Sequence, residues 1–267
     1  MNIFKLSRLL SRSLIGAVGL SASAMALLAV TQSSNAATVN PGLDYVFTPT
    51  GSATFFFDDP IDIGFVTFKG LPIDSSTLGI TDTIIRRTDP VSEPSGDTPI
   101  IIEDLSLVSV EAVGGKDVFV GLDPNMQSGG EMTIRHDESG DGGTWDSFFD
   151  INGIAIIADA GTLNPTGPDF IKNLIAGCPS ASYECQPFQK GTFIASNEPW
   201  SMTPGSDNFV GPESSNFFLT APVIHDAGDG TIHIVEPTPV PEPSATLALT
   251  LFALAGTWGL KKKQSFK

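Results

Sequence analysis

The sequence predicts an all-β domain, an antiparallel β-sandwich of jelly-roll-like type with one short helix. Its apolar residues form strand-length runs separated by Gly, Pro, Asp and Ser, as is typical of antiparallel sandwiches. Some runs alternate apolar and polar residues, as half-buried strands do, most clearly Phe65–Lys69 and Leu105–Val110. The predicted strand runs include Thr54–Phe57, Ile63–Phe68, Ile100–Val113, Met132–Ile134, Phe148–Ala158, Thr192–Ala195, Phe217–Leu219 and Thr231–Val235.

The chain begins with a predicted secretory signal peptide, residues 1–36. An apolar run rich in Ala, Gly and Leu, Leu14–Val30, is followed by Ser34-Asn35-Ala36, which places small residues where signal peptidase requires them. We expect cleavage after Ala36, with Ala37 as the alternative, and a retained N-terminal anchor is the competing interpretation. The Sec translocon and signal peptidase are therefore expected partners. The basic start of the segment is formed by Lys5, Arg8 and Arg12.

The predicted secreted domain spans residues 37–236 and is long enough to bury a core of its own. Between residues 37 and 239 the chain has seven Lys and Arg against 29 Asp and Glu, a net charge of −22. Such a surface repels nucleic acid and anionic lipid, so no nucleic-acid partner is expected. It favours solubility, divalent cations or basic partners.

One acidic loop suggests a calcium site. Its oxygen-bearing side chains and the following Gly142 match the first half of an EF-hand-like loop, in which alternate residues point inward and glycine permits the bend. The twelfth position is Phe148 instead of a bidentate Glu, so Asp146 or Asp150 would complete the site only in another geometry. The alternative is an Asp-Gly hairpin turn, here and in the related string His225–Thr231. The expected calcium ligands in the loop are Asp137, Ser139 and Asp141.

One helix is well marked, between Thr166 and Gly177. Pro168 suits its first turn, and Gly177 suits its C-terminal cap. An apolar face is supplied by Phe170, Ile171 and Leu174.

Two cysteines, Cys178 and Cys185, follow this helix. In an oxidising compartment a local disulfide is expected, and closing so short a loop would stabilise the fold by about 2–3 kcal/mol. A zinc site would need more ligands, since no His or other Cys lies nearby in the sequence. A redox pair is more often Cys-x-x-Cys, so we expect a structural role.

The sequence gives little support for catalysis, and we expect no enzyme activity. It contains neither a Gly-x-Ser-x-Gly elbow nor a His-Glu-x-x-His motif. Acidic pairs such as Asp58-Asp59 are similar to glycosidase carboxylates, but pairs arise by chance among 29 acidic residues. The three body histidines are expected at the surface or in turns: His136, His225 and His233.

The last segment, residues 237–267, combines a proline-rich linker with a sorting or anchor segment. Its uncharged run Ala245–Leu260 would form a helix about 24 Å long, shorter than a hydrocarbon core of about 30 Å. Trp258 and the lysines after the run would cover part of the difference and keep the basic end cytoplasmic. A buried core helix is the alternative. The run is bounded by Val240, Pro241, Glu242 and Pro243 before it and by Lys261, Lys262 and Lys263 after it.

This tail resembles the PEP-CTERM sorting signal of exopolysaccharide-producing Gram-negative bacteria and cyanobacteria. The resemblance covers Val240–Lys263, and its basic cluster is Lys where Arg is more usual. It implies recognition by an exosortase near the Pro-Glu-Pro triplet, transient anchoring in the inner membrane, and removal of the tail. The string Gly143–Asp150 is also similar to one in other secreted proteins that carry this tail.

Two functional hypotheses follow. The first is a non-catalytic extracellular or cell-surface protein associated with the exopolysaccharide matrix. The second is a carbohydrate-binding β-sandwich in which Trp145 or Trp200 stacks on sugar rings. An exposed, flat aromatic platform would support the second, and burial of both tryptophans would count against it. A secreted glycan-active hydrolase is the third and weakest hypothesis.

Overall fold

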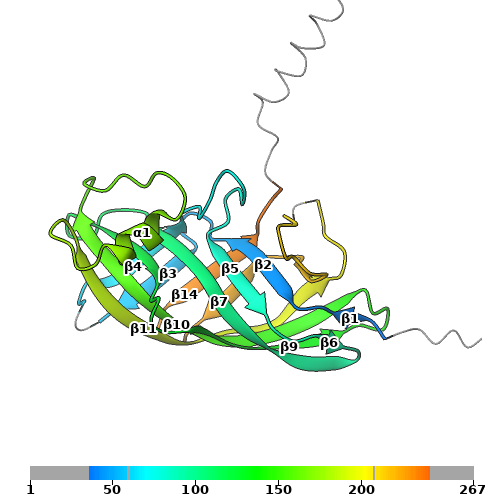
Figure 1. The fold of residues 1–267 in the computed structure, drawn as a ribbon. Coiled ribbons are helices and arrows are strands. Elements are labelled where there is room, and N and C mark those ends of the chain that lie inside the picture. Colours follow the sequence, from blue (N-terminus) through cyan, green and yellow to red (C-terminus); the bar gives the residue numbers. More distant parts are fainter. Residues whose placement is uncertain (1–35, 59–60, 207, 241–267) are drawn as a thin grey trace, which may run out of the picture. The chain divides into compact units, whose positions relative to one another are not determined.

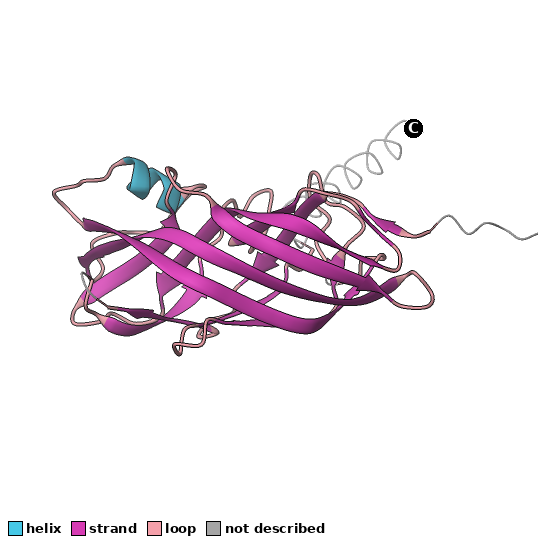
Figure 2. Ribbon diagram, turned by 90° about the horizontal axis from the view of Figure 1, so that it is seen from below, coloured by secondary structure: helices cyan, strands magenta, loops and turns pink. Residues whose placement is uncertain are grey.

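The computed structural model describes residues 36–58, 61–206 and 208–240. These residues form antiparallel β structure with one short helix (Figures 1 and 2). Twelve strands belong to one sheet, while β1 (Thr38–Val39) and β6 (Val91–Ser92) form a separate antiparallel pair. The prediction of an all-β antiparallel domain with one short helix is confirmed.

The twelve strands of the large sheet are linked by pairings that return to their starting strand. Their bounds are β2 Gly42–Phe47, β3 Ala53–Phe57, β4 Gly64–Gly70, β5 Thr83–Arg87, β7 Ser95–Ser109, β8 Lys116–Leu122, β9 Ser128–His136, β10 Gly142–Asp159, β11 Glu184–Ser201, β12 Phe218–Leu219, β13 Val223–Asp226 and β14 Ile232–Pro237. One circuit of neighbours runs β10-β8-β7-β4-β3-β14-β13-β11 and back to β10. The sheet therefore folds over a common core, with two opposed layers as in a sandwich (Figure 2).

Three long strands, β7, β10 and β11, hold the two layers together. They have 15, 18 and 18 residues, longer than any predicted run. Each changes partner along its length: β10 pairs with β9 over Gly143–Asp150 and with β8 over Gly153–Asp159. The sequence runs marked only parts of these strands because Gly, Pro and Asp inside them are typical turn residues, such as Pro99 and Gly142.

Inward side chains from both layers form the main core. Phe55 lies among Phe57, Phe68 and Phe193, with ring centroids 5.4–6.3 Å apart, and Phe149 stacks on Phe193 at 5.4 Å. A second, smaller apolar cluster lies on the outer side of β7, β8 and β10. It is formed by Val108, Phe119, Ile156, Ile171 and Ile175.

The helix α1 (Phe170–Ala176) covers this second cluster and lies outside the strand layers (Figure 2). It is shorter than predicted because Asp169, in the left-handed conformation, is its N-cap, so Pro168 precedes the helix. The Gly177 N–H closes the C-terminal end on the carbonyls of the last turn. Cys178 and Cys185 form the predicted disulfide, with their Cα atoms 6.1 Å apart.

Both predicted targeting segments lie outside the described residues except at their inner ends. Of the signal peptide only Ala36 is described, and of the sorting motif only Val240, which is exposed. Among the residues that are described, no helix combines the length and apolarity needed to cross a membrane.

Candidate functional site

The string Gly143–Asp150 lies on β10 and divides its side chains between the two faces of the sheet. Trp145 and Phe149 point inward and are 2% and 3% exposed, and Ser147 between them is also buried. Phe148 points outward and is 48% exposed. This is the two-residue alternation of a strand, so the same short string supplies both core and surface.

The expectation that Trp145 or Trp200 stacks on sugars does not fit the structure. Trp200 is 3% exposed and stacks on Phe217 with ring centroids 5.2 Å apart. Its indole Nε1 donates to the Arg135 carbonyl at 3.3 Å, and Trp145 packs edge-on against Phe217. Neither ring presents a face to solvent, because both belong to inward positions of long strands.

Two outward aspartates on β10 are acceptors for irregular backbone in β11. The β10–β11 register shifts twice, once beside Asp146 and once beside Asp150. Asp146 Oδ1 accepts the N–H of Asn197 at 2.7 Å, and Asp150 Oδ1 accepts the N–H and hydroxyl of Thr192, each at 3.1 Å. The two carboxylates thus satisfy N–H groups that the bulges leave outside the ladder.

Three of the four predicted calcium ligands, Asp137, Ser139 and Asp141, lie in one turn, whereas Asp146 lies on β10 outside it. Asp137 Oδ1 accepts the N–H and hydroxyl of Ser139 and the Gly140 N–H, at 2.7–3.0 Å, and these hydrogen bonds lower its pKa. Asp146 lies four residues beyond Gly142, roughly 13 Å along the strand, and is ion-paired with Arg135. In the described part of the chain no group of three or more His, Cys, Asp or Glu could hold a metal. The loop is a hairpin turn between β9 and β10.

Between the two bulges lies an exposed apolar pair, Phe148 and Ile194, which we call the platform. The two residues are direct cross-strand partners, 48% and 51% exposed. The same cross-strand row continues to exposed Glu131 on one side and exposed Asp226 on the other. The platform therefore has a carboxylate at each end.

The platform forms part of an open groove of ≈ 340 Å³ on the outer face of β9, β10 and β11, which run side by side in Figure 1. Hydroxyl and carboxylate groups border its apolar centre. Hydrogen bonds from Arg135 and from the Asn197 N–H lower the pKa of Asp146, so this carboxylate is charged. The groove is lined by Glu131, Thr133, Asp146, Ser147, Phe148, Thr192, Ile194, Ala195 and Ser196.

Two of the three histidines are buried, which corrects the surface prediction. His225 and His233 are cross-strand partners on β13 and β14, 3% and 2% exposed, with ring centroids 6.4 Å apart. His233 Nε2 is 2.8 Å from the Thr48 hydroxyl, which also contacts buried Asp82. Burial lowers the pKa of His225 to about 4 and of His233 to about 3, and raises that of Asp82 to about 7. The cavity beside the histidines is ≈ 10 Å³, too small for a substrate.

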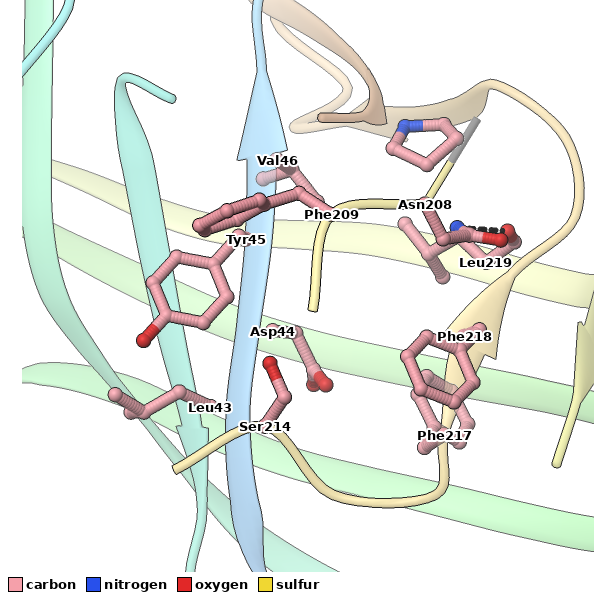
Figure 3. A pocket seen from close by; sticks show the side chains of 11 residues that line it. Leu43, Asp44, Tyr45, Val46, Asn208, Phe209, Ser214, Phe217, Phe218 and Leu219 are labelled. Atoms are coloured by element: carbon pink, nitrogen blue, oxygen red, sulfur yellow. Dashed lines mark hydrogen bonds between the residues drawn. The ribbon is translucent and has the colours of Figure 1, made fainter. Parts of the chain in front are cut away.

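The pocket in Figure 3, where residues 208–219 pack on β2, is also too small for an organic ligand. Its volume is ≈ 20 Å³, about the space of one water molecule. Asn208 Nδ2 donates to the Leu219 carbonyl at 3.0 Å, and the Tyr45 hydroxyl donates to the Pro212 carbonyl. These contacts fasten the loop onto the sheet, so we assign the pocket a structural role.

The platform residues are not among the site residues predicted from the sequence, although the sequence contains a signal for them. Phe148 and Phe149 are adjacent, and adjacent residues of a strand face opposite sides, so one ring had to lie on the outer face of the sheet. No protein-family model, curated protein or solved structure matches this chain.

Proposed function

We propose that this chain is a non-catalytic extracellular protein of the cell surface that associates with exopolysaccharide through the Phe148–Ile194 platform. The observation that carries the binding role is the exposed apolar pair in a ≈ 340 Å³ groove, bordered by carboxylates and hydroxyls. The location rests on the sequence: the signal peptide 1–36 and the PEP-CTERM-like tail. The disulfide Cys178–Cys185 agrees with an oxidising compartment.

The platform suits a neutral sugar chain. The Phe148 ring offers a π-face to the C–H groups of a pyranose, and Ile194 extends the apolar contact. Glu131 and Asp226 at the ends of the row accept hydrogen bonds from sugar hydroxyls. The hydroxyl of Thr133 or Ser196 both donates and accepts such hydrogen bonds. The same carboxylates repel uronates and sulfated sugars.

A glycan-active hydrolase is the weaker proposal. A retaining or inverting mechanism needs two carboxyl groups flanking the bond to be broken. Asp146 and Asp150 face the same side of β10, but each is held by backbone N–H groups of a β11 bulge. Both carboxylates accept backbone hydrogen bonds that hold the two strands together, and this favours a binding role over hydrolysis.

Binding is tested by affinity electrophoresis of the secreted protein in gels that contain polysaccharide. Neutral exopolysaccharide should retard the protein, whereas a uronate-rich polymer of similar size should not. Equal retardation by both polymers, or by neither, contradicts binding at an acidic-rimmed platform.

Sorting is tested by the intact mass of the protein recovered from the medium. The proposal predicts a mass that lacks residues 1–36 and the tail beyond about Pro243. Replacing Pro241, Glu242 and Pro243 by Ala should leave the protein membrane-associated and unprocessed. A secreted form that keeps Lys261–Lys263 would contradict exosortase processing and indicate a retained anchor.

A further inference from the structure

A separate cavity of ≈ 320 Å³ lies between α1 and the outer side of β7 and β8. Its volume falls within the range of small-molecule sites. Its walls are mainly apolar, supplied by Leu122, Pro124, Ile171, Ile175 and Ala176. Three charged residues also line it, Glu103 and Asp104 from β7 and Lys172 from α1.

The Asp104 carboxylate lies in this cavity because the alternation of inward and outward side chains along β7 is shifted at this point. Ile85 pairs with Ile102 and Ile84 with Asp104, so Glu103 is an extra residue on β7. As a result, Ile102 and Leu105 both face the main core. The side chain of Asp104 points to the outer side of the sheet, beneath α1. The Asp104 carboxylate is thus placed among apolar side chains by backbone geometry.

The cavity is held open by fixed contacts around α1. Gly121 lets the helix approach, because a Cβ there would lie 2.5 Å from Ile171 Cγ2 and 2.8 Å from Ile175 Cδ1. Asp169 N–H donates to the Ile73 carbonyl at 2.8 Å before the helix. After it, the disulfide and the Tyr183 hydroxyl, which donates to the Leu174 carbonyl at 2.8 Å, hold the chain.

The side chains of Asp104 and Lys172 differ in their freedom to move. The Asp104 side chain is 6% exposed, whereas Lys172, its ion-pair partner, is 54% exposed. Lys172 Nζ also lies 3.5 Å from Asp169 Oδ1, so Lys172 keeps an ion-pair partner when it moves away from Asp104 into solvent. Glu103, at the rim, is already paired with Arg86. With Asp104, Asp169 and Glu103 against Lys172 and Arg86, the surroundings of the cavity keep a net negative charge and favour a cation over an anion.

We propose that this cavity binds a small organic cation, a primary ammonium on a short apolar body. The ammonium replaces that of Lys172 at Asp104, and the apolar body contacts Leu122, Ile171 and Ile175. Lys172 moves into solvent beside Asp169. This site is independent of the platform, because it lies on a different part of the sheet and uses none of its residues.

Hexylamine, hexanol and hexanoate serve as matched probes in calorimetric or NMR titrations of the secreted protein at pH 7. We expect hexylamine to bind about tenfold or more tightly than either of the other two, since a charge-assisted hydrogen bond to a buried carboxylate is added. Asp104→Asn should weaken hexylamine binding by a similar factor, while Lys172→Ala should leave hexylamine binding unchanged or make it tighter. Ala176→Trp, which fills the mouth of the cavity, should abolish binding of all three.

Asp159→Asn is the control, because it removes an exposed carboxylate paired with Lys116 away from the cavity. It should leave hexylamine binding as in the wild type. No hexylamine binding, equal or tighter binding of hexanoate, or an Asp104→Asn variant that binds as the wild type would overturn the proposal. If Asp104→Asn does not fold, Ala176→Trp decides: undiminished hexylamine binding would place the site elsewhere.

Discussion

The same residue type is buried on the inner face of the sheet and partly exposed on the outer face, as Arg87 and Arg86 on β5 show. Arg87 points inward and its side chain is 0% exposed; its Nε and Nη2 each donate to the Asp44 carboxylate at 2.8 Å. The guanidinium also lies over the Phe217 ring, 4.5 Å from its centroid. Arg86 points outward and pairs with Glu103, both about one-third exposed.

This difference separates residues that hold the fold from residues that are free to serve binding. A buried polar group must keep its partners, because an unpaired charge in the core costs several kcal/mol. An exposed outer-face residue has little effect on stability, so Phe148 and Ile194 can remain exposed for a function. The following predictions test this separation by changing an inward residue and its outward neighbour in the same way.

The largest effect is expected at the arginines. Arg87→Met leaves Asp44 buried without its counter-ion and should lower the free energy of unfolding by about 3–5 kcal/mol. Arg86→Met removes two partly exposed ion pairs, with Glu103 and Glu213, and should change the free energy of unfolding by less than about 1 kcal/mol. Chemical denaturation of the two variants measures both values. Similar losses in the two would show that burial does not distinguish these neighbours.

The phenylalanines on β10 give the next comparison. Phe149→Ala opens a cavity beside Phe193 and should cost about 3–5 kcal/mol. Phe148→Ala removes an exposed ring and should stay within about 0.5 kcal/mol of the wild type. Urea midpoints at a constant m-value test this. A large loss for Phe148→Ala would mean that its ring supports the fold.

A pH-dependent loss of stability should come from the inner histidines. The unfolded His225 takes up a proton below its ordinary pKa of 6.5, whereas the folded one does so only near 4. The free energy of unfolding should therefore fall as pH drops from about 6.5 to 4, by about 3 kcal/mol for this group. Buried Asp82, with its pKa raised to about 7, acts in the opposite direction: stability falls as pH rises from about 4 to 7.

His225→Phe isolates the histidine contribution, since its neighbours His233 and Asp82 are kept. Unfolding measured from pH 7 to pH 4 should show a shallower decline for this variant than for the wild type. Identical profiles would mean that His225 is not protected from protonation in the folded state. A substitution of exposed Lys69 on β4 by Met should leave the profile parallel to that of the wild type.

Among the features expected to stabilise the fold, the disulfide should have the smallest effect. Replacing Cys178 and Cys185 by Ser should lower the free energy of unfolding by about 2–3 kcal/mol, because only a short loop is released. Reduction of the wild-type protein should produce the same change. A much larger loss would mean that α1 and its apolar cluster depend on the bond for folding.

The features that the sequence predicted are those encoded locally. Alternation marks strands, Gly177 ends the helix, and two cysteines close in sequence form a short bridge. The features that it missed depend on distant pairing. Whether Trp145 faces in or out is fixed by the register of β10 against β9 and β11, and Asp104 turns beneath α1 because of one extra residue opposite β5. Local sequence does not fix either.

The histidines were misplaced for the same reason. His225 begins a string that is typical of a turn, and a turn does follow, but His225 itself lies within β13 and points inward. The calcium ligands were grouped by spacing along a loop, whereas β10 carries Asp146 away from that loop. Spacing along the chain becomes spacing in space only when the backbone conformation is known.

The most direct test of the central claim is the retardation of Phe148→Ala by neutral exopolysaccharide, compared with that of Phe65→Ala. Phe65 is an equally exposed ring on the outer face of β4, 57% exposed, and lies outside the platform groove. The account predicts that Phe148→Ala raises the dissociation constant about tenfold or more, as loss of a stacking contact does, while Phe65→Ala binds as the wild type. Equal affinity of Phe148→Ala and the wild type would contradict the platform as the binding surface.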